Sequence, residues 1–169
     1  VCALEAGAAV TMIEKAPEVG GTTALSGGLV WTIADYDRIR SDIPHGDAAL
    51  QWLVYDNVDA ARTWLASKGA KLGPDEPLLG YGRGRIMEDP VQVIGALSDR
   101  FRQLGGKMFL STALDALLTK EGAVCGVRAI SNGQPIEFSA DAVILATGGF
   151  QGNPELLAAA SHSPSVKSR

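Results

Sequence analysis

Residues 9–28 read AVTMIEKAPEVGGTTALSGG, and this stretch predicts the fold class of the chain. It opens with a short apolar run, residues 9–14, that ends in the acid Glu14. Such a run is typical of a strand buried in a parallel sheet. The glycine pairs Gly20-Gly21 and Gly27-Gly28 follow. Glycine permits positive φ and a close approach of the backbone, so we interpret these residues as a loop shaped against a ligand. A flexible linker would also be rich in Gly and Ser, but it would rarely begin directly on a strand and an acid.

Glu14 stands where dinucleotide-binding βαβ units place an acid, at the end of the second strand. A carboxylate there accepts hydrogen bonds from the adenosine ribose hydroxyls, because it offers two acceptor oxygens. The competing interpretation is an ordinary solvated acid at a strand end, and the glycine-rich loop that follows favours the ligand. Thr22, Thr23 and Ser26 add hydroxyls that, together with backbone N–H groups, can bind a pyrophosphate and the polar edge of a flavin.

The ends of the chain bear on domain organisation. Residues 1–7, VCALEAG, read as the end of a helix with Gly7 in the left-handed position that follows it. We therefore expect the start of that helix, a first strand and its phosphate-binding G-x-G-x-x-G to precede the first residue. The sequence predicts a partial domain over residues 1–160, with an irregular and helical insertion at about 35–105, and a polar tail over 161–169.

Two helices are predicted within that insertion. Residues 47–67 repeat apolar side chains every three or four positions. The face predicted to be buried consists of Leu50, Leu53, Val54, Ala61, Trp64 and Leu65. In the second helix, residues 90–104, Asp89 is the expected N-cap and Pro90 takes the first helical position. Between the two helices, residues 73–90 are rich in Gly and Pro and are predicted to be irregular.

The C-terminal part is predicted to be mainly β. Residues 107–111, KMFLS, read as a strand, and three further runs are joined by Glu121-Gly122 and Asn132-Gly133. Asn-Gly favours a type I′ turn, so these runs predict a three-stranded antiparallel meander. The continuous apolar run in residues 141–149, DAVILATGG, predicts a buried parallel strand. The expected fold class is α/β, Rossmann-like, with a parallel sheet and the meander.

Composition and charge exclude several function classes. The 169 residues include 15 basic and 19 acidic side chains, a net charge of -4 that argues against a nucleic-acid partner. The sequence holds no apolar run near the ~18 residues of a membrane span. Cys2 and Cys125 lack the spacing of a metal site or a disulfide framework, and they favour a reducing compartment. We therefore predict a cytoplasmic protein.

The motifs together resemble one family of flavoproteins. They resemble the FAD-binding domain shared by the fumarate reductase and succinate dehydrogenase flavoprotein subunits and the 3-ketosteroid dehydrogenases. The resemblance covers roughly residues 1–160 and implies a Rossmann-like FAD-binding fold with FAD as cofactor. It also implies an oxidoreductase that hydrogenates or dehydrogenates a carbon–carbon bond next to a carbonyl of a small molecule. The motifs that carry it are Glu14-Lys15, Gly20-Gly21-Thr22-Thr23, Ser26-Gly27-Gly28 and the ATGGF of residues 146–150.

The resemblance implies roles for individual residues. Glu14 would bind the adenosine ribose, and the backbone at Ala113 would meet the adenine. Thr22 and Thr23 would lie along the pyrophosphate and the flavin. The glycines of the second pair would pass close to the isoalloxazine ring. The whole set implied to bind FAD is Glu14, Lys15, Gly21, Thr22, Thr23, Ser26, Gly27, Gly28, Ala113, Ala146, Thr147 and Gly148.

The substrate class stays open between a dicarboxylate and a steroid-like enone. Thr22 stands where fumarate reductases typically have Asn, and Trp31 follows the second glycine pair, two features closer to the 3-ketosteroid dehydrogenases. In that branch Tyr81 would be an active-site candidate, although a loop tyrosine used for packing is the simpler interpretation. A non-enzymatic flavin-binding module is the third possibility. No catalytic residue and no metal ligand is assigned.

Overall fold

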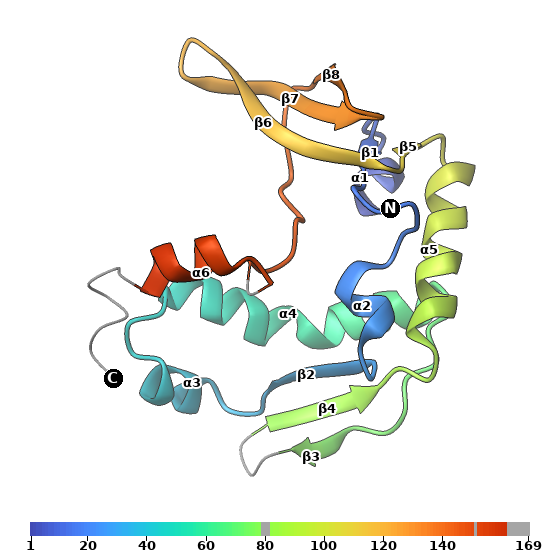
Figure 1. Ribbon diagram of the computed structural model, residues 1–169. Helices are drawn as coiled ribbons and strands as arrows, with labels where there is room; N and C mark the ends of the chain where they lie inside the picture. The colour runs from blue at the N-terminus through green and yellow to red at the C-terminus, as the bar shows by residue number, and fades with distance from the viewer. Residues whose placement is uncertain (79–81, 151, 162–169) are drawn as a thin grey trace.

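The structure is a computed structural model that describes residues 1–78, 82–150 and 152–161 (Figure 1). Tyr81 and most of the predicted tail, residues 162–169, lie outside the described residues. In chain order the elements are α1 (Cys2–Glu5), β1 (Thr11–Ile13), α2 (Gly21–Leu25), β2 (Leu29–Ile33), α3 (Tyr36–Asp42), α4 (Ala48–Ser67), β3 (Glu76–Leu78), β4 (Gly82–Ile86), α5 (Pro90–Gln103), β5 (Lys107–Phe109), β6 (Thr112–Lys120), β7 (Ala123–Ser131), β8 (Gln134–Ser139) and α6 (Pro154–Ser161).

A parallel pair of strands forms the Rossmann-like part of the fold. β1 pairs with β5, with Thr11 opposite Lys107 and Ile13 opposite Phe109. Before β1, α1 ends and Gly7 adopts a φ of 89°, as predicted. The predicted strands are thus confirmed, although β1 is shorter than the apolar run from which it was predicted. The α/β class and the parallel pairing are therefore confirmed.

The segment predicted to be irregular, residues 73–90, contains two strands, so that prediction was wrong. β2, β4 and β3 form an antiparallel sheet in which β4 is central. The sequence of β4 does not look like a strand, because glycines occupy the alternate positions where apolar side chains would be expected. A side chain at Gly82 would occupy the place of the Trp31 ring, and one at Gly84 would meet Leu29 and Leu78. Glycine in a strand often marks such a close approach.

Both long helices are capped by an aspartate: Asp89 is the N-cap of α5 as predicted, and Asp47, predicted as the first residue of its helix, is the N-cap of α4. The carboxylate of Asp47 accepts from Leu50 N, and that of Asp89 accepts from Gln92 N, both at 2.9 Å. α5 presents an apolar side to the small core, where Val93 is buried against Ala70 and Met87. α5 therefore packs on the same small core as Val30 of β2 and Leu65 of α4.

The predicted buried face of α4 is only partly buried. Leu50, Leu53 and Val54 are 62%, 57% and 62% exposed in the described structure. Farther along the helix, Leu65 packs against the core while Arg62 is only 3% exposed. The prediction failed for the first half of α4 because apolar periodicity identifies a face without saying whether a neighbour covers it.

The meander is confirmed. β6, β7 and β8 pair antiparallel in sequence order and lie together at one end of the molecule (Figure 1). Asn132 and Gly133 have φ values of 51° and 75°, the two positive values that a type I′ turn requires. Phe138 of β8 packs edge-on against Phe109 of β5, with ring centroids 4.9 Å apart. This contact helps to fix the meander on the parallel pair.

The predicted parallel strand within residues 141–149 does not form. These residues run from β8 toward α6 without strand structure, and Ile144 is 85% exposed (Figure 1). A parallel strand forms only beside a hydrogen-bonding neighbour. Within the described residues β1 pairs on one edge only, with β5, and residues 142–146 pair with no strand. The apolar run therefore lacks the neighbour that would make it a strand.

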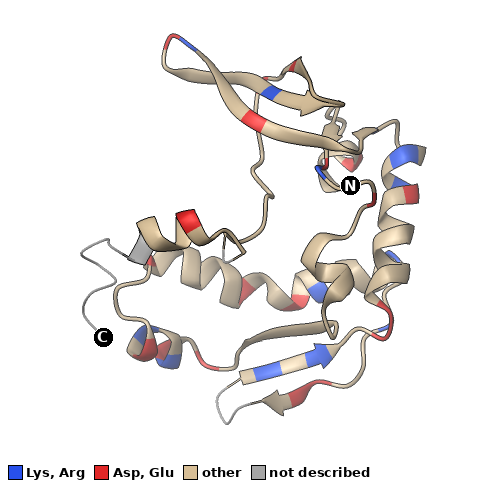
Figure 2. Cartoon of the chain, in the orientation of Figure 1, with Lys and Arg blue, Asp and Glu red and all other residues tan. Residues whose placement is uncertain are grey.

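Charged residues of both signs occur on several elements of the fold. Lys or Arg and Asp or Glu occur together on α3 and α5, and β4 contributes Arg83 and Arg85 (Figure 2). None of the described helices combines the length and the apolarity that a membrane crossing requires. The described residues likewise bring together no group of three or more potential metal ligands.

Candidate cofactor-binding site

Glu14 lies at the junction between the parallel pair and the meander. Its backbone N–H donates to the carbonyl of Phe109, and its carbonyl accepts from Thr112 N at 2.8 Å. The meander thus begins beside Glu14, which brings Ala113 near it in the structure. The side-chain Oε1 of Glu14 accepts from Ala16 N at 2.8 Å. Within the described residues Oε2 has no hydrogen-bond partner, so it is available to a donor such as a ribose hydroxyl.

The glycine-rich loop folds into the short helix α2. Gly20 and Gly21 enter it with φ values of 127° and 47°, and Thr22 and Thr23 lie exposed on its first turn. The hydroxyl of Ser26 donates to the carbonyl of Thr23 at 2.8 Å and accepts from Gly28 N at 3.2 Å. Ser26 therefore shapes the turn between α2 and β2, while Thr22 and Thr23 remain exposed.

The glycines of the second pair differ in what surrounds them. A Cβ at Gly28 would lie 2.5 Å from the carbonyl oxygen of Met87 and 3.0 Å from Cγ of Pro90, and φ there is 74°. The fold alone thus demands glycine at this position. A Cβ at Gly27 would meet no described atom within 4 Å. Gly27 therefore presents bare backbone to open space, as a surface for a flat ring would.

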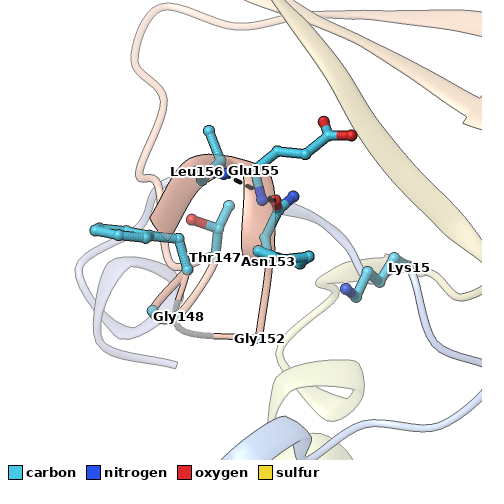
Figure 3. A pocket seen from close by; sticks show the side chains of 10 residues that line it. Lys15, Thr147, Gly148, Gly152, Asn153, Glu155 and Leu156 are labelled. Carbon is cyan, nitrogen blue, oxygen red and sulfur yellow. Dashed lines mark hydrogen bonds between the residues drawn. The ribbon is translucent and has the colours of Figure 1, made fainter. Parts of the chain in front are cut away.

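A cavity brings two distant predicted segments together (Figure 3). It has a volume of about 670 Å³ and lies between Lys15, just after β1, and the segment that leads into α6. Asn153 caps α6 by accepting from the backbone N–H groups of Glu155 and Leu156, each at 3.0 Å. The cavity is lined by Lys15, Thr147, Gly148, Gly149, Phe150, Gly152, Asn153, Pro154, Glu155 and Leu156.

The predicted residues gather at three places. Glu14 lies near Ala113, Lys15 shares the cavity with Thr147 and Gly148, and the α2 loop forms the third place. Neither Ala146 nor any residue of the α2 loop lines the cavity. The sequence did not identify Asn153, although Asn-Pro ahead of a helical run is a helix-start signal.

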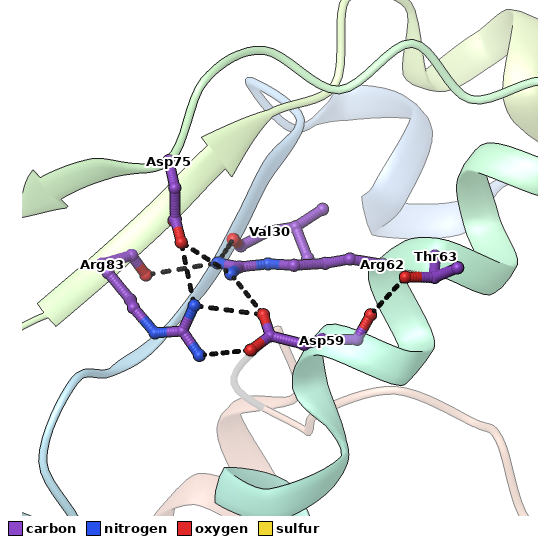
Figure 4. Close-up of polar contacts among 6 residues, drawn as sticks. All are labelled: Val30, Asp59, Arg62, Thr63, Asp75 and Arg83. Carbon is purple, nitrogen blue, oxygen red and sulfur yellow. Dashed lines mark hydrogen bonds and ion pairs between the residues drawn. The ribbon is translucent and has the colours of Figure 1, made fainter.

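A cluster of four charged residues lies under β2 and β4 (Figure 4). We call Asp59, Arg62, Asp75 and Arg83 the arginine cluster. Arg83 donates to Asp59 and to Asp75, each at 2.8 Å, and Arg62 contacts the same two carboxylates at 3.1 and 3.4 Å. Hydrogen bonds from Arg83 hold the pKa of Asp59 below its ordinary value, and those same bonds raise the pKa of Arg83. The charged forms of Asp59 and Arg83 therefore stabilise each other.

The geometry described above agrees with one family of cofactor-binding domains. The chain matches the FAD binding domain family over residues 1–168. It belongs to that family. The family match identifies FAD as the cofactor of the chain.

Several known proteins are similar to this chain. A urocanate reductase of Eggerthella lenta is 31% identical over 91% of the chain, and the chain spans only 30% of that relative's length. Two solved structures share the fold, each with a TM-score of 0.74. One is a 3-ketosteroid-Δ4-(5α)-dehydrogenase of Rhodococcus jostii with 4-androstene-3,17-dione, 21% identical over 93% of this chain and 44% of that one. The other is a flavocytochrome c3 fumarate reductase, 23% identical over 98% of this chain and 33% of that one.

The described residues fit FAD. Gly21, Gly27 and Gly148 each leave open the space that a side chain would fill. Lys15 has no ion-pair or hydrogen-bond partner among the described residues and lines the cavity beside Thr147. A cation suits the pyrophosphate, bare glycine backbone suits a flat ring, and the free Oε2 of Glu14 suits a ribose hydroxyl.

We expect Glu14→Ala to weaken FAD binding by the complete protein by about 1–3 kcal/mol, because a bound ribose loses a charged acceptor. Glu14→Gln is the matched control, since its amide oxygen can keep the bond from Ala16 N seen for Oε1. FAD titration of the apoprotein measures both variants. A Glu14→Ala protein with wild-type affinity would remove Glu14 from the cofactor site.

Proposed function

We propose that this chain is the FAD-holding part of an oxidoreductase that adds or removes hydrogen across a carbon–carbon bond next to a carbonyl. The observation that carries the proposal is the 31% identity to a urocanate reductase along 91% of the chain. The bare Gly27 backbone and the cavity beside Lys15 support it, because they suit a flavin and its pyrophosphate.

FAD, when bound, supplies the hydride transfer that protein side chains cannot perform. The chain contributes binding and orientation. Glu14 would hold the ribose, and Lys15 would offset phosphate charge at the cavity. Gly27 would let the ring approach the backbone. The carbonyl of Gly28 accepts from Met87 N at 2.8 Å, which holds that turn in place. The proton donor or acceptor for the second carbon is not among the residues assigned here.

The preferred substrate is an unsaturated carboxylate, by analogy with the urocanate reductase and with the fumarate reductase that shares the fold. The runner-up, a 3-ketosteroid dehydrogenase, has one observation of its own. Next to β2 a mainly apolar hollow of about 340 Å³ lies between Trp31, Ile39 and Leu50, with Asp47 and Gln51 also at its lining, and none of the described residues that line it is a lysine or an arginine. Such a lining suits an uncharged polycyclic substrate better than a dicarboxylate.

Anaerobic flavin spectroscopy of the complete protein tests the proposal. We expect purified protein to show oxidised-flavin absorbance that dithionite bleaches and that urocanate or fumarate then restores. A 3-ketosteroid that bleaches the oxidised flavin directly would favour the runner-up. Flavin that binds stoichiometrically yet exchanges electrons with none of these compounds would indicate a binding module, and protein without flavin would refute the proposal.

A further inference from the structure

The strand that follows the glycine turn has a weak intrinsic register. β2 pairs with β4, whose sequence GRGRI offers only one apolar side chain. Register is poorly specified in glycine-rich strands, and a slip of one residue moves a strand by about 3.4 Å and exchanges its two faces. Since Leu29 follows Gly28 directly, such a slip would also move Gly27. The Trp31 ring beside Gly82 and the Leu29 side chain beside Gly84 help to hold the register, and a group that binds the backbones of both strands would hold it further.

Arg62 of α4 is placed to do this. Its Nη2 donates to the carbonyl of Val30 on β2 at 2.9 Å and to the carbonyl of Arg83 on β4 at 3.5 Å (Figure 4). One guanidinium thus contacts the backbones of both strands from the α4 side. Val30 lies two residues beyond Gly28, so this contact is close to the turn that the proposed function assigns to the flavin.

The rest of the arginine cluster keeps that guanidinium in place. Nη1 of Arg62 contacts Asp59 and Asp75, and Arg83 binds the same two carboxylates, so two cations face two anions. Arg62 is 3% exposed, and its Nε has no partner among the described residues. Burying a charge with an unsatisfied donor is costly. A buried charged group of this kind can favour one conformation of the chain without raising the overall stability of the fold.

We propose that Arg62 is a positioning residue for the flavin, because it ties β2 to β4 and thereby sets where the Gly27 backbone lies. This inference rests on the proposed function. Arg62 does not touch the cofactor itself. It acts through Val30 and the turn that precedes it, while Asp59, Asp75 and Arg83 hold its side chain at the required angle.

The test uses the complete protein and three variants. Arg62→Met removes the charge and the donors, and Arg62→Lys keeps the charge but loses the planar fork that reaches carbonyls and carboxylates together. Arg128→Met is the control, because Arg128 forms a 2.6 Å ion pair with Asp115 that is exposed on the meander. Each variant is measured for FAD affinity, for the visible spectrum and midpoint potential of the bound flavin, and for the melting temperature of the apoprotein.

We expect Arg62→Met to raise the Kd for FAD about 10-fold, which corresponds to a turn that is in the binding-competent position only about a tenth of the time once Arg62 no longer holds β2. The flavin spectrum and midpoint potential should shift as well. Arg62→Lys should show a smaller change in the same direction, and Arg128→Met none. If Arg62→Met does not fold, the comparison of Arg62→Lys with the wild-type protein tests the inference instead.

A purely structural role would lower the melting temperature yet leave the Kd, the spectrum and the potential unchanged well below that temperature, and this result would overturn the inference. Failure of the proposed function is a different outcome. In that case the wild-type protein itself would bind no FAD, or would bind it without redox chemistry.

Discussion

Gly27→Val is expected to give a folded protein that purifies nearly free of FAD. Gly27 has no described atom within 4 Å of the position of a Cβ, so the fold has room for the valine side chain. A flavin that lies against this backbone would leave no room for the valine side chain. Overpacking of this kind costs about 3 kcal/mol, or roughly 100-fold in Kd. The measurement is the ratio of flavin to protein absorbance after gel filtration, with the melting temperature of the apoprotein as the check on folding.

Gly28→Val is the contrasting variant. Its Cβ would lie 2.5 Å from the Met87 carbonyl, and φ at Gly28 is 74°. This substitution should therefore lower the melting temperature of the apoprotein, whereas Gly27→Val should not. Full flavin occupancy in a folded Gly27→Val protein would show that the turn does not contact the ring. Gly27→Ala should have an effect of the same kind but smaller.

The second large effect concerns these 169 residues produced alone. We expect them to self-associate and to retain little FAD. Within the described residues β1 is paired on one edge only, residues 142–146 form no strand, and Leu145 is 57% exposed. Open strand edges beside exposed apolar side chains promote association between chains. Gel filtration with absorbance detection at a flavin wavelength measures both properties together.

The complete protein is the control in that experiment and should elute as a discrete, yellow species. A monomeric 169-residue chain that keeps one FAD through the column would contradict the expectation. It would show that the β1 edge and the residues before α6 need no further partner for cofactor binding.

Local signals predicted the elements that local chemistry determines. Asp89 acts as the predicted cap of α5, and Asn132-Gly133 forms the predicted turn of the meander, because each depends on residues a few positions away. The sequence did not predict β4 because its glycines look like loop residues. They are needed for contacts such as that of Gly82 with the Trp31 ring, and Trp31 is far from them in sequence. The strand expected within residues 141–149 depended on a neighbour that the described chain does not supply.

The residues of the candidate site likewise fall into those that the sequence predicted and those that it did not. Motifs predicted that Lys15 and Thr147 belong together, and the structure places both at one cavity. Their contact with FAD remains a prediction. The sequence could not distinguish Gly27 from Gly28, because the difference lies in the Met87 carbonyl. Arg62 was missed because an arginine within a helix usually lies in solvent, and nothing local shows that this one is buried.

The uneven burial of α4 implies that its two ends differ in local stability. Around Leu50 the helix contacts α3, where the Tyr36 ring packs edge-on against Trp52 and Arg40 donates to Gln51, and it contributes no side chain to the small core, so its first turns can open together with α3. Around Arg62 the helix is tied to β2 and β4, so an amide there can open only when the sheet contacts separate too. The helix therefore spans two cooperative units, and motion at its solvent-facing end need not reach the strand that follows the glycine turn.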